Sequence, residues 1–122
     1  MTVKECYSQM NGDYNNVLSR FYDEAMIKRL LGRFIDDTSF RALEQAMAEG
    51  DVQAAFNAAH TLRGVCQSLS FTQLCGTLDP ITEALRGGNI AAAAADMDKA
   101  KREYDVTLSA IRCLLYTSDA AD

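Results

Sequence analysis

Apolar residues recur at intervals of three and four along most of the 122-residue chain, and this spacing lines up side chains on one face of an α-helix. The clearest run lies between residues 51 and 69, where the intervals are nearly heptad: Val52, Ala55, Ala59, Leu62, Cys66 and Leu69. The chain holds a single proline and many good helix formers, which favours helix over sheet. The pattern therefore predicts an all-α protein.

Capping and helix-ending residues divide the chain into helices joined by short loops. Asp13, Asp51 and Asn89 have side chains suited to N-caps, while Gly50 and Gly87-Gly88 are suited to helix ends. Helices are predicted over 13–20, 23–36, from Thr38 or Ser39 to Gly50, 51–69, 72–86 and 89–112, with Pro80 expected to kink or split its helix. Short loops make neighbours antiparallel, so we predict an up-and-down four-helix bundle with one or two short extra helices at the N-terminus.

The last ten residues, CLLYTSDAAD, resemble translated read-through of a sequencing adapter. We interpret residues 1–112 as one helical domain and 113–122 as a non-native tail that is excluded from functional reasoning. Leu114 and Leu115 are expected at most to prolong the last helix, and Cys113 to have no biological role.

Charge and composition exclude several classes of partner. The net charge is −5 and no basic stripe occurs, so neither nucleic acid nor anionic membrane is expected to bind. No apolar run approaches the roughly 20 residues of a membrane span, and the first ten residues do not resemble a signal peptide, so we expect a cytoplasmic protein. Four cysteines without CxxC spacing and a single histidine make a metal site improbable, so we expect mostly buried reduced thiols and no metal or cofactor of its own.

His60 lies on the same predicted helix as the apolar run but on the opposite side. At about 100° per residue it is about 160° from Leu62, so its imidazole should face water. Its neighbours on that face are Gln53, Phe56, Asn57, Arg63, Gly64 and Gln67. A lone histidine on an arbitrary bundle would first be interpreted as incidental. An exposed aromatic residue and a mid-helix glycine beside it favour a functional face instead, with Gln53, Phe56 and Asn57 contacting a partner.

Gly64 and Arg63 indicate which chemistry this face could support. A mid-helix glycine costs about 0.5–1 kcal/mol relative to alanine, and its usual benefit is that another molecule can come close. A neutral imidazole is a suitable nucleophile for reversible phosphoryl capture, and the permanently cationic Arg63 can stabilise phosphoryl oxygens. The loose transition state of phosphoryl transfer needs mainly positioning and charge, so few residues suffice.

The segment Ala59-His60-Thr61-Leu62-Arg63-Gly64 resembles the AHxLKG signature of histidine-containing phosphotransfer domains, and Ser68-Leu69-Ser70-Phe71-Thr72 resembles that family's turn into the next helix. The resemblance extends over nearly all of the chain up to residue 112. The chain departs from the family pattern in having Arg63 for the usual lysine, Gln67 for a common asparagine and Ser70 for a frequent glycine.

The resemblance implies a phosphorelay intermediate in two-component signalling. His60 would be the phospho-acceptor, Arg63 the charge-stabilising cation, Gly64 the clearance for a receiver domain, and Gln67 an orienting residue. The implied partners are response-regulator receiver domains or a hybrid histidine kinase, with magnesium held by the receiver. We expect a monomeric carrier without kinase activity of its own.

The main alternative is a non-catalytic helical adaptor whose Phe56, His60 and Gly64 face binds a partner without chemistry. An autonomous kinase is disfavoured because no Gly-rich phosphate loop or kinase-type nucleotide signature is present. A haem or metal bundle would need inward histidines or paired Glu-x-x-His motifs, which the sequence lacks.

Overall fold

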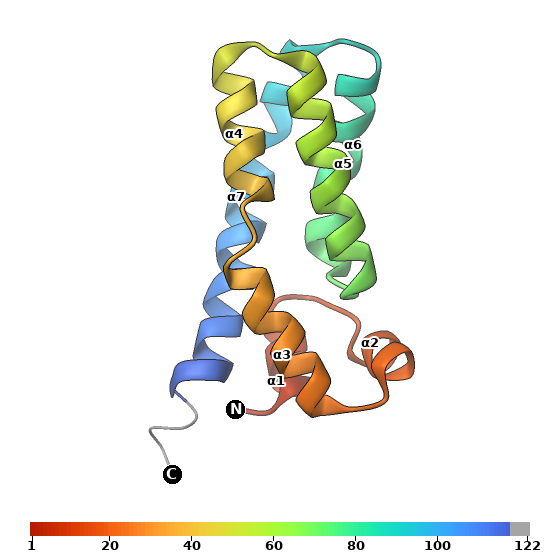
Figure 1. Ribbon diagram of the computed structural model, residues 1–122, viewed down its shortest axis with the longest axis vertical. Coiled ribbons are helices and arrows are strands. Elements are labelled where there is room, and N and C mark those ends of the chain that lie inside the picture. The colour runs from red at the N-terminus through yellow and green to blue at the C-terminus, as the bar shows by residue number, and fades with distance from the viewer. Residues whose placement is uncertain (118–122) are drawn as a thin grey trace.

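A computed structural model describes residues 1–117, and almost all of them lie in helices (Figure 1). The helices are α1 (Val3–Gln9), α2 (Tyr14–Phe21), α3 (Glu24–Ile35), α4 (Ser39–Glu49), α5 (Val52–Ser68), α6 (Thr72–Arg86) and α7 (Ile90–Arg112), followed by the π-helical turn η1 (Cys113–Thr117). No strand occurs within this described part, so the all-α prediction is confirmed. The last five residues of the segment interpreted as a tail, 118–122, lie outside the described residues.

Side-chain caps begin the helices close to where the sequence predicted them. Asp13, Asp51 and Asn89 each form such a cap. In each, a side-chain oxygen of the cap accepts a hydrogen bond at 3.0 Å from the backbone N–H three residues later in the chain. Gly50 ends α4 with a φ of 69°, a left-handed conformation that favours glycine. Thr38 precedes α4 without capping it through its side chain, and Asp37 accepts from the N–H of Ser39 at 2.8 Å instead.

Pro80 lies inside α6 without interrupting it, so a split of this helix at the proline is wrong. Proline cannot donate to the carbonyl four residues earlier, which here belongs to Gly76. Both residues are exposed, so water can replace the missing hydrogen bond.

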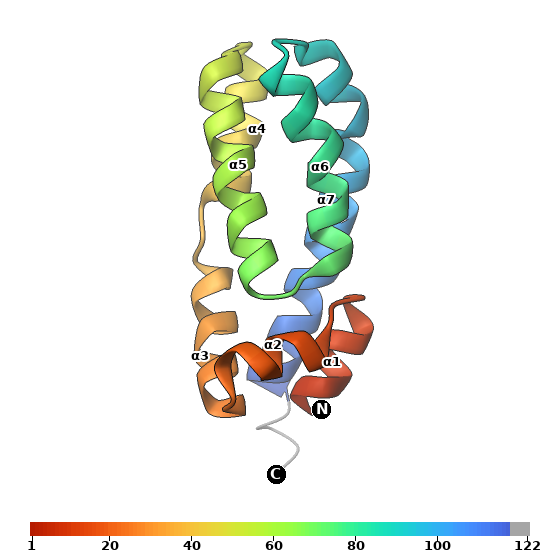
Figure 2. The ribbon, with the colours of Figure 1, turned by 90° about the vertical axis from the view of Figure 1, so that its right-hand side faces the viewer.

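Helices α4, α5, α6 and α7 lie side by side, with successive helices running in opposite directions (Figures 1 and 2). The long α7 extends below α4, α5 and α6. Helix α3 lies end to end with α4 and contacts the lower part of α7. The two short predicted N-terminal helices are α1 and α2, which pack at the same end as α3. None of the helices within residues 1–117 is long and apolar enough to cross a membrane.

Aromatic residues join the N-terminal helices to the turn between α5 and α6. The ring of Phe71 lies 5.0 Å from that of Phe34 and 6.0 Å from that of Tyr7, measured between centroids. The buried Tyr7 hydroxyl donates a hydrogen bond to the carbonyl of Leu69 at 2.8 Å. These contacts fix the end of α5, and with it the helix that carries His60.

Ser70 occupies this turn with a φ of 60°, a conformation that glycine adopts more readily. Its hydroxyl hydrogen-bonds Asn16 Oδ1 at 2.6 Å, and its carbonyl accepts from the N–H of Asp13 at 2.9 Å. The serine therefore gains hydrogen bonds to the N-terminal segment that a glycine could only partly make. This explains how serine is accommodated where the resembled family often has glycine.

The first residues of the segment interpreted as a tail pack against the domain. As expected, η1 continues the last helix, but Leu114 is 1% exposed and belongs to the core. Leu115 is partly buried, and its Cδ1 lies 3.7 Å from where a Cβ of Gly32 would be. Removing residues 113–122 should therefore reduce stability, because the segment does more than prolong the last helix.

Replacing Leu114 with alanine should lower the free energy of unfolding by about 2–5 kcal/mol, because it empties a buried leucine site. Urea denaturation measures this change. Tyr116→Ala is the matched control, since Tyr116 is 62% exposed and should change stability by less than about 0.5 kcal/mol. Equal effects of the two substitutions would show that η1 does not pack as described.

Candidate functional site

His60 lies near the middle of α5 with its side chain exposed. The opposite side of the helix is buried completely, with Ala55, Ala59, Leu62 and Cys66 all at 0% exposure. The prediction that His60 faces water is therefore confirmed. No hydrogen bond to the His60 imidazole occurs from any other residue in the described part of the chain.

Phe56 lies one turn before His60 and stacks on it. The two ring centroids are 5.7 Å apart and the rings are inclined by only 19°. On α6, the guanidinium carbon of Arg86 lies 5.5 Å from the Phe56 ring centroid, within the range of a cation–π contact. Phe56 is therefore partly buried, and the expectation of an exposed aromatic residue is wrong because neighbours cover the ring.

Arg63 lies one turn after His60 and is engaged by a residue of the neighbouring helix. Its Nε forms an ion pair and hydrogen bond with Oδ1 of Asp79 on α6, with 37% and 49% of the two side chains exposed. The hydrogen bond and negative charge of Asp79 raise the pKa of Arg63 above its ordinary value. The cation predicted to serve His60 is thus already paired with a carboxylate.

A second arginine comes from α6. Arg86 Nη1 forms an ion pair with Glu83 Oε1 at 3.1 Å, and both side chains are more than half exposed. Sequence reasoning centred on α5 missed Asp79, Glu83 and Arg86. Their spacing of four and three residues would have placed them on one face of α6, but not beside His60.

Gly64 leaves the next turn of α5 open. A Cβ atom built at this position would have no neighbouring atom within 4 Å, so nothing in the domain requires a glycine there for space. The glycine is also exposed and has no positive φ that would demand it. The turn beside His60 is therefore open, and the role of Gly64 as a clearance for a partner stays a prediction.

The remaining predicted site residues lie further along α5. Gln53 and Asn57 precede His60 on α5, and both side chains are exposed. Gln53 Nε2 donates a hydrogen bond to Asn57 Oδ1 at 3.0 Å. Gln67 lies about two turns after His60 and lines a separate cleft of about 400 Å³ together with Ser70, Cys75 and Asp79. The structure therefore places Gln67 nearer the Arg63–Asp79 pair than the imidazole.

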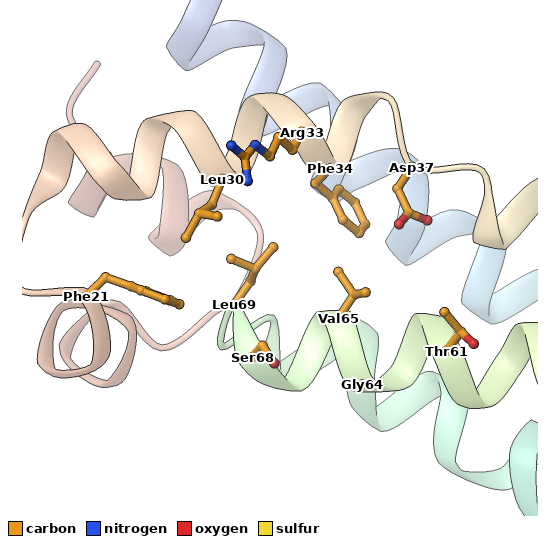
Figure 3. Close-up of a pocket in the computed structure, with 10 residues that line it drawn as sticks. All are labelled: Phe21, Leu30, Arg33, Phe34, Asp37, Thr61, Gly64, Val65, Ser68 and Leu69. Atoms are coloured by element: carbon orange, nitrogen blue, oxygen red, sulfur yellow. The ribbon is translucent and has the colours of Figure 1, made fainter.

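Gly64 also borders an apolar cleft of about 530 Å³, which lies between α5 and the helices α2 and α3 (Figure 3). Phe21, Leu30, Phe34, Val65 and Leu69 contribute apolar side chains to it, and Arg33 and Asp37 lie at its α3 side. Three helices contribute these residues, so no local spacing in the sequence indicated the cleft.

The described cysteines and acidic residues form no metal-binding cluster. Cys6, Cys66 and Cys75 are free thiols, with Cys6 and Cys66 buried and Cys75 partly buried, and Cys113 is also partly buried. Burial raises the pKa of Cys66 and so keeps its thiol neutral. Within residues 1–117, no three or more His, Cys, Asp or Glu side chains are grouped so that they could hold a metal ion.

Comparison with known proteins identifies the fold that carries this site. A protein-family model described as Hpt domain matches residues 29–112, which include His60, Arg63 and Gly64 and extend from α3 to the end of α7. The comparisons with curated proteins and with solved structures found no match.

Gly64→Ala should raise the free energy of unfolding by up to about 1 kcal/mol, because a methyl group enters open space and removes the entropic penalty of a mid-helix glycine. Thermal or urea unfolding measures this. Gly12→Ala is the contrasting control, since a Cβ there would lie 2.7 Å from Tyr7 Cδ2 and should destabilise the fold. A destabilised Gly64→Ala variant would contradict the open geometry of this turn.

Proposed function

Since the chain belongs to the Hpt domain family, which serves histidine phosphotransfer in two-component signalling, we propose that His60 carries the phosphoryl group and exchanges it with receiver domains. The observation that supports this most directly is the placement of the chain's single histidine on an exposed helix face beside an open glycine turn. The family match covers this helix in full.

In the proposed reaction, a ring nitrogen of neutral His60 attacks the phosphorus of an aspartyl phosphate on the receiver. A nitrogen–phosphorus bond forms while the phosphorus–oxygen bond to the aspartate breaks, and the carboxylate leaves with the electron pair. The proton on the other ring nitrogen can pass to water, because His60 is exposed. The same steps in reverse deliver the group to a second receiver.

The charge for this transfer would come from both proteins. Phosphoryl transfer is catalysed mainly by positioning and electrostatic stabilisation, and His60 has a permanently charged arginine one turn away. We place any magnesium ion in the receiver rather than in this chain. Gln67 remains a candidate orienting residue, acting from the side of the Arg63–Asp79 pair.

The receiver would cover the exposed face of α5. Phe56, Asn57 and Gln53 extend this face before His60, and the apolar cleft continues it after Gly64. Gly64 and Thr61 line the cleft and also flank His60 in the helix, so one partner surface can contact both. A receiver that presents an apolar side chain next to its phosphorylated aspartate would fit this arrangement.

His60→Gln should abolish phosphoryl acceptance and leave the melting temperature nearly unchanged, because an exposed side chain without hydrogen bonds contributes little to the core. The assay incubates the chain with a panel of phosphorylated receivers and looks for acid-labile, base-stable label. Glu44→Gln, on the exposed side of α4, is the control and should accept label normally. Label retained on His60→Gln would exclude His60 as the acceptor, and a wild-type chain that binds receivers without taking label would favour the adaptor alternative.

Gly64→Leu and Gly64→Gln should remain folded and lose most phosphoryl transfer. Either side chain would project into space that a receiver must occupy, and would hold the reacting atoms beyond about 3–3.5 Å. Transfer rates measured in quenched reactions, together with thermal unfolding curves, separate an effect on phosphoryl transfer from an effect on folding. Transfer at the wild-type rate in both variants would show that the open turn has no role in receiver binding.

A further inference from the structure

Asp79 is the feature of the site that the proposed function leaves without a role. It is a carboxylate on α6, and it forms an ion pair with the cation that follows His60 by one helical turn. A negative charge at this place opposes an incoming phosphoryl group. A positioned carboxylate that is unfavourable for the expected chemistry needs an explanation.

Arg63 has two anions within reach once His60 is phosphorylated. Side chains three residues apart on a helix are neighbours, so the guanidinium can reach a group on His60 by rotating away from α6. A phosphoryl group carries a charge of about −1.5 to −2 and presents three acceptor oxygens, which makes it the stronger ligand. Arg63 cannot lose its proton, so only its orientation can change.

The ion pair is exposed enough to exchange partners. With 37% of Arg63 and 49% of Asp79 exposed, water screens their attraction, and pairs of this kind contribute little to stability. We propose that Asp79 is a positioning residue that holds Arg63 against α6 while His60 is free and releases it to the phosphoryl group when His60 is phosphorylated. This inference rests on the proposed function of His60 as the phosphoryl carrier.

The other ionisable groups on this side of α6 do not share this role. Glu83 pairs with Arg86, and Arg86 lies over Phe56. Cys75 is partly buried, and burial raises the pKa of its thiol, which keeps it neutral. Asp79 is therefore the carboxylate whose removal should free Arg63, and Glu83 offers a matched control on the same helix.

The test loads His60 chemically, so that it does not depend on finding a receiver. Phosphoramidate phosphorylates imidazole: a nitrogen–phosphorus bond forms on the ring while the bond to ammonia breaks and ammonia leaves. His60 is the single histidine in the chain, so the phosphohistidine signal in ³¹P NMR belongs to it. Titrating the chemical shift gives the proton affinity of the phosphoryl group, which falls when a cation stabilises its dianionic form.

The comparison uses the wild type, Asp79→Asn, Arg63→Gln and the double variant. Asp79→Asn should lower the proton affinity of the phosphoryl group by about 2- to 5-fold, the amount expected for freeing one partly exposed partner. In the Arg63→Gln background the same substitution should give less than half of this change on a logarithmic scale. Glu83→Gln should have a smaller effect than Asp79→Asn.

Two results would overturn the inference. An unchanged proton affinity in Asp79→Asn would show that Asp79 does not compete with the phosphoryl group for Arg63, and an equal change in both backgrounds would show that Asp79 acts by its charge alone. Asp79→Ala must agree with Asp79→Asn, and unfolding curves of all variants confirm that each is measured in the folded state. A chain that is loaded by phosphoramidate but by no receiver would contradict the proposed function and still decide the role of Asp79.

Discussion

Close packing of one side of α5 determines which of its residues can meet a partner. The alanines at positions 55 and 59 are fully buried, so neighbouring helices approach the α5 backbone closely, and Leu62 and Cys66 continue the same contact. A rotation of α5 would expose these residues and bury His60 without a hydrogen-bonding partner, both of which are unfavourable. The exposure of the imidazole thus follows from packing on the far side of the helix.

The antiparallel contact between α5 and α6 then sets the electrostatics of the exposed face. It brings Asp79 to Arg63 and Arg86 to Phe56, so two of the residues about one turn from His60 each have a charged neighbour from α6. Each arginine is paired with a carboxylate, since Arg86 contacts Glu83. The charges on this face are therefore locally balanced, and in the proposed function an incoming phosphoryl group would compete with carboxylates for the arginines.

Local chemistry predicted most of the fold. Caps such as Asp51 and the left-handed Gly50 act within one turn of helix, so their spacing alone indicated where helices begin and end. The position of His60 followed from helical periodicity in the same way. The pairing of Arg63 with Asp79 and the cleft beside Gly64 arise between helices, and their geometry depends on how the helices pack. Buried Leu114 was missed because a segment interpreted as foreign was not expected to join the core.

The absence of a hydrogen bond to the His60 imidazole from any described residue has a consequence for how such a carrier behaves among several partners. In the proposed function, a proton that moves during uptake or delivery would therefore pass to water or to the partner protein. In the proposed function, the net movement of phosphate would follow the relative concentrations and hydrolytic free energies of the phosphorylated receivers. The same molecule could then fill or drain a given receiver, according to which partners the cell has made.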